Sequence, residues 1–281
     1  MKTILLPFHD EAAGRVALDT ACRVAKRFGS YVEGLLVREH PHVDIVPGMP
    51  VSAAYLSEAA KEWRSFADAS RGHFLQYLEE RGVPYGELEV EADGATAAWR
   101  ELEGRESGTV GTYGRLFDLI VLGRVTSEAT ERWQATCEAA MFESGRPVLL
   151  APPEPPEVIG RKILVAWNGS TETARTVALT MPFLTAAEEV LVLGVEGWIP
   201  GGPAGTELAH HLVRNGVNAS YDLVKPSGVS AGEAILEECA RTGCDLLVKG
   251  AYTRTRFTQV MFGGATLHVM QNATLPVVMA H

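Results

Sequence analysis

Two stretches of the chain carry the same pattern, Asp118-Leu119-Ile120-Val121-Leu122-Gly123 and Asp245-Leu246-Leu247-Val248-Lys249-Gly250. Each is a short apolar run between an aspartate and a glycine. Apolar runs that do not alternate with polar residues are typical of parallel strands, because helices cover both faces of such a sheet. The pattern therefore predicts two copies of one α/β fold.

The duplication extends to the first and last strands of each half. Residues 4–7 match 163–166, and residues 147–151 match 276–280. The first strands lie 163 − 4 = 159 residues apart, the glycine-ended strands 245 − 118 = 127, and the last strands 276 − 147 = 129. The first half therefore holds 159 − 127 = 32 extra residues after its first strand. We expect this insertion within residues 40–81, with a long helix over 53–81.

The boundary between the halves is marked by prolines. Pro152-Pro153-Glu154-Pro155-Pro156 forms a stiff spacer that fits neither a helix nor a central strand. We predict a first domain over residues 1–151, a proline-rich linker over 152–160 and a second domain over 161–281. The length of 281 residues agrees with two domains of roughly 150 residues.

The second half has a regular alternation of elements. We expect strands near 162–167, 190–195, 219–224, 245–249 and 276–280, and helices near 171–185, 204–215, 230–241 and 264–272. Ser230 with Glu233 three residues later is a helix-start signal, and Gly243 is a helix-end signal. Alternating strands and helices predict two tandem doubly wound parallel-sheet domains.

Composition excludes several partners. The chain has 25 Lys and Arg against 35 Asp and Glu, a net charge of −10, and no large basic cluster. A nucleic-acid partner is therefore not expected. No apolar run approaches the ~20 residues of a membrane span, and the N-terminus does not resemble a signal peptide. We expect a cytoplasmic protein with reduced cysteines, the alternative being a disulfide between Cys239 and Cys244.

Ligands of doubly wound sheets bind at the carboxyl ends of the strands. In the second half the loops at this edge begin at Ala166-Trp167-Asn168 and at Gly250, and the second loop runs on to Gly263-Gly264 at a helix start. Backbone N–H groups of such glycines, with the positive end of the helix dipole, can hold a phosphate. A glycine pair at a helix start is equally compatible with a plain turn.

These features together resemble the universal stress protein family, in its tandem form, over nearly the whole chain. The fold is also that of adenine-nucleotide α-hydrolase-like proteins. ATP-binding members carry Gly, two residues, Gly, nine residues, Gly, and then Ser or Thr. The matching positions here are Gly250, Thr253, Gly263 and Gly264, so the second glycine and the hydroxyl residue are replaced. Thr266 is a substitute for that hydroxyl.

The resemblance implies a stress-response regulatory module with ATP or another adenine nucleotide as its cofactor. The nucleotide would lie across the first and fourth strands, with its phosphates on the backbone of Gly263 and Gly264. Asn168, where the family has an acidic residue, would contact the nucleoside, and the backbone at Val195 would meet the adenine. An amide offers one acceptor and one donor where a carboxylate accepts two hydroxyl bonds.

The first half lacks these signals. His9 stands in place of the acidic residue, no glycine pair opens the helix that ends near Met141, and Glu128 and Glu131 would repel phosphates there. We expect no nucleotide in this half. His9 beside Asp10 fits a structural histidine better than an acid–base catalyst.

No metal site is expected. His40 and His42 flank a proline in a turn, and the adjacent His210 and His211 face different directions on a helix. Arg254 and Arg256 are either phosphate contacts or solvated loop charges. No nucleophile, Walker or dinucleotide motif occurs, so we expect no catalytic residues.

Two alternatives remain. In the first, the protein is a nucleotide-free scaffold whose halves pair through their final strands, 148–151 and 277–280, with the insertion at 40–81 as a surface for an unknown protein partner. A homodimer stays open in this interpretation. In the second, the chain is an enzyme such as a nucleotidyl transferase or an electron-transfer flavoprotein. Those proteins need an HxGH or Ser-Gly-Gly-x-Asp loop, and neither occurs.

Overall fold

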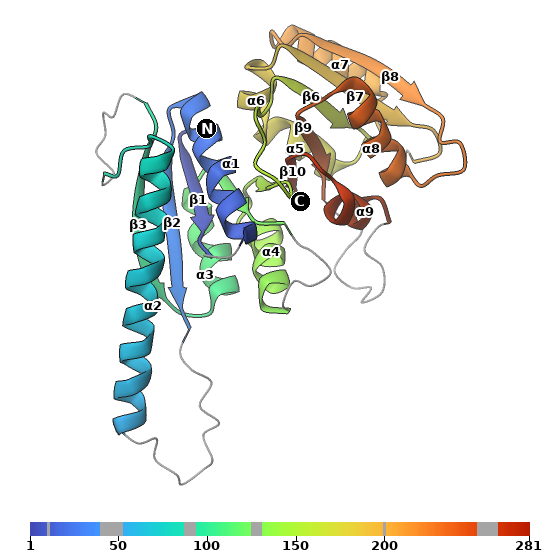
Figure 1. Ribbon diagram of the computed structural model, residues 1–281. Helices are drawn as coiled ribbons and strands as arrows, with labels where there is room; N and C mark the ends of the chain where they lie inside the picture. The colour runs from blue at the N-terminus through green and yellow to red at the C-terminus, as the bar shows by residue number, and fades with distance from the viewer. Residues whose placement is uncertain (10–11, 40–52, 87–93, 125–130, 199–200, 252–263) are drawn as a thin grey trace, which may run out of the picture.

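A computed structural model describes residues 1–9, 12–39, 53–86, 94–124, 131–198, 201–251 and 264–281. Two half-sheets lie side by side and join into one ten-stranded sheet (Figure 1). The strand order is β3-β2-β1-β4-β5-β10-β9-β6-β7-β8, so each half has the order 3-2-1-4-5 counted from its own first strand. Within each half all pairings are parallel. The predicted α/β fold class with a parallel sheet is confirmed.

The first half alternates strands and helices in the order expected for a doubly wound sheet. Its elements are β1 (Thr3–Pro7), α1 (Ala12–Phe28), β2 (Tyr31–Arg38), α2 (Ala53–Glu80), β3 (Thr96–Glu103), α3 (Glu106–Tyr113), the 3-10 turn η1 (Gly114–Leu116), β4 (Leu119–Leu122), α4 (Glu131–Glu143) and β5 (Val148–Leu150).

The second half repeats this order. Its elements are β6 (Lys162–Ala166), α5 (Thr171–Leu179), α6 (Met181–Thr185), β7 (Glu189–Val195), α7 (Gly205–Arg214), β8 (Ala219–Val224), α8 (Ala231–Thr242), β9 (Leu246–Gly250), α9 (Gly264–Asn272) and β10 (Val277–Ala280). The helix-start signal is confirmed, since the Ser230 hydroxyl accepts the backbone N–H of Glu233 at 3.2 Å. Gly243 ends α8 with φ 64°, as its position predicts.

One predicted helix is wrong. The segment 171–185 was expected to be continuous, but it divides into α5 and α6 at Thr180. Pro182 lies in the first turn of α6, where backbone N–H groups have no partner within the helix, so a residue without an N–H is tolerated. The proline therefore begins a new helix in place of extending the old one.

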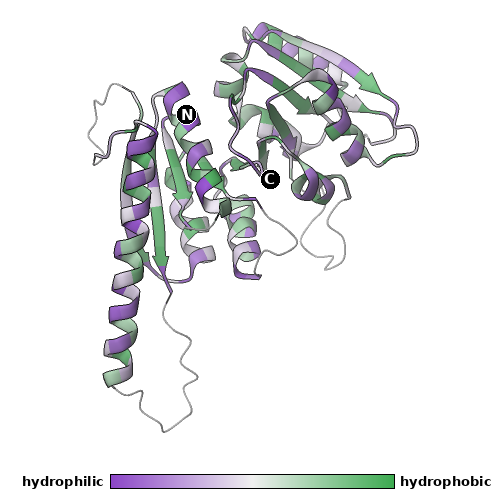
Figure 2. Ribbon diagram, in the orientation of Figure 1, coloured by the Kyte–Doolittle hydropathy of each residue, from purple (hydrophilic) through white to green (hydrophobic). Residues whose placement is uncertain are grey.

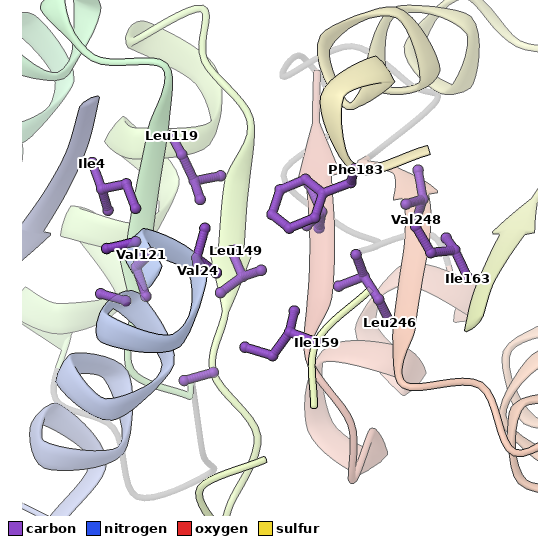
Figure 3. Close-up of a cluster of buried hydrophobic side chains, with 14 of the residues drawn as sticks. Ile4, Val24, Leu119, Val121, Leu149, Ile159, Ile163, Phe183, Leu246 and Val248 are labelled. Atoms are coloured by element: carbon purple, nitrogen blue, oxygen red, sulfur yellow. The ribbon is translucent and has the colours of Figure 1, made fainter. Parts of the chain in front are cut away.

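The two halves join through their last strands. β10 pairs antiparallel with β5, with Val278 opposite Leu149. Figure 3 shows that buried side chains meet on both sides of this junction, Leu149 and Ile4 from one half and Phe183 and Val248 from the other. Because an exposed strand edge is open to pairing with other chains, this junction removes one edge from each half-sheet.

The extra length of the first half lies between β2 and β3. There α2 has 28 residues, whereas its counterpart α7 has 10. The C-terminal part of α2 packs on the sheet through Phe74 and Leu78, which are 0% and 1% exposed. The N-terminal part extends beyond the carboxyl end of β2 (Figure 1).

Side-chain chemistry agrees with this architecture. The inner strands of both halves are hydrophobic, whereas the edge strands β3 and β8 include charged residues and the helices carry mixed surfaces (Figure 2). Within the described residues, no helix combines the length and apolar character that crossing a bilayer would need.

All four cysteines are free thiols, so the disulfide between Cys239 and Cys244 does not form.

Candidate functional site

The carboxyl ends of β6, β7 and β9 meet at one edge of the second half, beside the first turn of α9. Ala166 and Val195 end β6 and β7, and both are fully buried. Gly250 ends β9, and Gly264 is the first residue of α9 and exposed. Thr253 and Gly263 lie outside the described residues, as do Arg254 and Arg256.

Asn168 follows β6 and is 3% exposed. Its side-chain oxygen accepts the Thr173 hydroxyl at 2.6 Å and the backbone N–H of Ser170 at 3.1 Å. Asn168 thus fixes the loop that leads into α5, a local role typical of asparagine in turns. Its oxygen is therefore engaged within the loop.

Gly250 has a packing reason to be glycine. A Cβ at this position would lie 2.6 Å from the backbone nitrogen of Thr173 and 2.8 Å from its hydroxyl. The first turn of α5 therefore lies directly against the end of β9. This contact accounts for Gly250 whether or not a phosphate binds nearby.

Lys249 places a buried ammonium group at the same edge. The residue is 2% exposed, and its Nζ donates to the Thr266 hydroxyl at 2.7 Å and to the Gly250 carbonyl at 2.9 Å. Nζ also lies 5.5 Å from the centroid of the Trp198 ring, close enough for a cation–π contact. Thr266 is in the first turn of α9 and is itself 5% exposed. Lys249 thus connects β9 to the start of α9.

Burial sets the ionisation of Lys249. Removal from water lowers the pKa of its ammonium group to about 7. Among the described residues, its hydrogen-bond partners are neutral oxygens, and no carboxylate forms an ion pair with it. A lysine buried without a counter-charge destabilises a fold, and such groups are concentrated at functional sites.

A glycine contact holds the neighbouring loop over the end of β6. A Cβ on Gly202 would lie 2.4 Å from the carbonyl oxygen of Gly169, and both residues have positive φ. The Trp167 indole N–H donates to the Pro203 carbonyl at 2.9 Å from the same loop. Residues 201–203 therefore pack against the loop after β6 and form one wall of the site.

The equivalent edge of the first half carries a different set of groups. His9, just beyond β1, lies with Nε2 3.2 Å from Oε1 of Glu106 at the start of α3. Its ring makes an edge contact with Trp133 at 4.8 Å. Asp10 and Glu128 lie outside the described residues. The partner of His9 is Glu106, 97 positions away in the sequence.

Glu106 is the centre of this cluster. Its carboxylate is 5% exposed, accepts the Thr136 hydroxyl at 3.0 Å and lies 3.3 Å from Arg132. Glu39 accepts the backbone N–H of Glu106 at 2.8 Å and pairs with Arg132 at 3.4 Å. Burial alone would raise the pKa of Glu106, but the hydrogen bond and charge of His9, with Arg132 and Thr136, lower it overall. The cluster is ionic and internally paired.

Arg124 connects the two sites. It follows β4 in the first half, and its guanidinium donates to the carbonyls of Gln271 and Ala273 at the end of α9 in the second half. These are carbonyls that a helix end leaves without intrahelical partners. Partial burial lowers the pKa of Arg124. The helix whose start adjoins Lys249 is thus anchored at its other end by the first half.

Sequence reasoning missed four of these residues: Lys249, Glu106, Arg132 and Arg124. One signal for Lys249 was present, because it is a lone charge in an apolar strand where the first copy has Leu122. No comparable signal marks Glu106, since its role depends on which loops the fold brings together. No group of three or more metal-ligating side chains occurs in the described ranges.

A doubly wound α/β fold with a ligand edge at its strand ends defines a broad class of proteins. Residues 224–281, which include β9, α9 and β10, match the model of the Universal stress protein family. Over its whole length the chain has the fold of universal stress protein structures, and the resemblance derived from the sequence is confirmed.

Two solved structures illustrate the likeness. A universal stress protein from Archaeoglobus fulgidus DSM 4304 superposes with a TM-score of 0.69 at 13% identity, over 99% of this chain and 97% of the other. A protein of Pseudomonas aeruginosa UCBPP-PA14, provisionally assigned to the universal stress proteins, gives a TM-score of 0.53 at 13% identity, over 100% of this chain and 93% of the other. No curated protein matches the sequence.

Proposed function

We propose that the protein is a stress-response regulatory module that binds an adenine nucleotide in its second half, with little or no hydrolysis. The observation that supports it is the placement of Gly250, Thr266 and the exposed Gly264 at one edge, inside the segment that matches the family model. Gly264, the exposed first residue of α9, presents its backbone N–H at the positive end of a helix, which favours an anion there.

The first half is not included in this proposal. Glu106 and Glu39 occupy its corresponding edge, and both would oppose a phosphate. The Thr136 hydroxyl donates to the Glu106 carboxylate there, but both residues are buried, at 0% and 4% exposed, so we propose no catalytic step. One nucleotide per chain is the expected stoichiometry.

Calorimetry of the full chain with ATP, ADP and AMP tests the proposal. We expect one site per chain, and we expect Gly264→Asp to weaken binding because it adds a carboxylate at the start of α9. Ser227→Asp is the matched control, since it adds the same charge at an exposed position between β8 and α8. Absence of heat and of thermal stabilisation at millimolar nucleotide would remove the nucleotide from the function.

The second candidate function is a nucleotide-free scaffold for another protein. The projecting part of α2 favours it, because its apolar surface continues beyond the sheet. Leu56 and Phe66 are 50% and 52% exposed, and the Phe66 ring lies 5.5 Å from that of Trp63. Capture of a partner that is lost in a Leu56→Glu, Phe66→Glu double variant, kept in Lys61→Ser and indifferent to ATP would favour the scaffold.

A further inference from the structure

Lys249 is the buried group whose placement the fold does not explain. Its strand neighbours Leu247 and Val248 are fully buried hydrophobic residues, and the corresponding position of the first half is Leu122. A leucine or methionine would fill this space without placing a charge in the interior. The lysine instead points its Nζ at Thr266, in the first turn of α9.

Among the residues that the structure describes, no carboxylate forms an ion pair with Lys249. Its pKa is lowered by burial, with no contribution from a charged neighbour. The titratable or charged groups on the described elements packed around it are Glu172 and Arg175 on α5, Glu196 beyond β7, Glu233, Glu237, Glu238 and Arg241 on α8, His268 on α9 and His281 after β10. Of these, Glu196 pairs with Lys225 at 3.5 Å and Glu238 pairs with Arg241.

We propose that Lys249 supplies the positive charge that holds the phosphates of the bound nucleotide, and that binding therefore takes up one proton. The inference rests on the proposed function and adds the regulation of its site by pH. A phosphate chain over the first turn of α9 would lie next to the Thr266 hydroxyl that Lys249 holds. In that poorly screened interior the phosphate charge stabilises the ammonium form.

The linkage has a definite sign. The free protein holds Lys249 partly neutral near pH 7, whereas the complex holds it charged. Binding is therefore strongest below pH 7 and weakens as the solution becomes alkaline. With one proton linked, the affinity falls by about fivefold from pH 7 to pH 8 and by about tenfold for each further pH unit, until the pKa of the complex is reached.

The test is calorimetric titration of the full chain with ATP and with inorganic tripolyphosphate at pH 6, 7, 8 and 9. Each titration is run in two buffers of different ionisation enthalpy, which counts the protons taken up. Lys249→Met keeps the length and apolar stem of the side chain without the charge. Lys225→Met removes a charge that is 77% exposed beyond β8 and serves as the control.

The expected result is uptake of about half a proton at pH 7 and close to one at pH 8 and 9, binding at pH 9 at least tenfold weaker than at pH 7, and loss of both effects in Lys249→Met but not in Lys225→Met. ATP binding without proton uptake, or unchanged in Lys249→Met, would overturn the role of Lys249 and leave the proposed function standing. Tripolyphosphate binding with proton uptake but no preference for ATP would support Lys249 and overturn the nucleotide. Absence of binding by either ligand would overturn both.

Discussion

The carboxyl edges of the two half-sheets have the same backbone arrangement but carry different charged side chains. Gly123 follows β4 and Gly250 ends β9, and each lies against the first turn of the helix that follows the first strand of its half, at Ala13 and Thr173. Beyond this shared contact, the first edge holds a paired acidic cluster around Glu106, and the second holds Lys249, which forms no ion pair within the described part of the chain. The glycine at each edge is therefore explained by helix packing, whereas the charged residues determine what each edge could bind.

The largest expected effect is the loss of stability when a methyl group is added to each of these two glycines. Gly250→Ala should lower the free energy of unfolding by about 3 kcal/mol, because its Cβ would lie 2.6 Å from the backbone nitrogen of Thr173. Gly123→Ala should cost about 1 kcal/mol, since its nearest contact is 3.1 Å, to the Ala13 carbonyl oxygen.

Urea unfolding of both variants gives the comparison, with Gly264→Ala as the control. A Cβ on Gly264 meets no atom within 4 Å, so that variant should be neutral or slightly more stable. If Gly250→Ala proves as stable as Gly264→Ala, the packing explanation of Gly250 fails.

The packing of the strands was open to prediction, while the polar contacts were not. The strand positions of the second half, apart from the mixed β8, follow from short apolar runs, and the start of α9 follows from its glycines, because these signals are local. The split of 171–185 does not follow from the spacing of apolar residues, because it depends on Pro182, which cannot donate a helical hydrogen bond. His9 and Glu106 lie 97 positions apart, so their pairing depends on the topology of the finished sheet.

The next effect concerns the cost of burying Lys249. Its pKa of about 7 in the folded protein lies below the roughly 10.4 of an unfolded chain, so between these values the unfolded chain holds the extra proton. Stability should therefore rise by about 2 kcal/mol as the pH increases from 7 to 9. Lys249→Met should remove this dependence and gain about 2 kcal/mol at pH 7, after loss of the Thr266 hydrogen bond.

Urea unfolding of wild type, Lys249→Met and Lys225→Met at pH 7, 8 and 9 measures the difference. The difference between wild type and Lys249→Met should shrink as the pH rises, while Lys225→Met follows wild type. A Lys249→Met protein that is less stable than wild type at every pH would mean that the ammonium group stabilises the fold.

A smaller change in stability is expected in the first half, where the buried group is a carboxylate. The pKa of Glu106 is lowered in the folded protein, so its carboxylate contributes stability above the unfolded pKa of about 4.3. That contribution is lost as the pH falls through the lower, folded pKa. Glu106→Gln should cost about 2 kcal/mol at pH 7, because it removes the charge that His9 and Arg132 contact.

Denaturant unfolding at pH 7 and pH 3 measures this cost, which should be smaller at the acid pH. Glu103→Gln is the control, since its carboxylate is 60% exposed and pairs only with Arg38 at 3.3 Å among its described contacts. Equal losses in the two variants at pH 7 would show that the buried cluster contributes no more than a surface pair.

The smallest effect concerns the contact that joins the two edges. Arg124 donates to the carbonyls of Gln271 and Ala273, so Arg124→Ala should cost about 1 kcal/mol and loosen the end of α9. Hydrogen exchange should accelerate in residues 269–275 and stay unchanged in β7. Arg161→Ala is the control, because Arg161 is 54% exposed and lies 3.8 Å from Glu188. If nucleotide affinity also falls in Arg124→Ala but not in Arg161→Ala, the first half acts on the site of the second through α9. Unchanged exchange in α9 would mean that the Arg124 contacts do not hold this helix end, and that the β5–β10 pairing and the buried core across it join the halves.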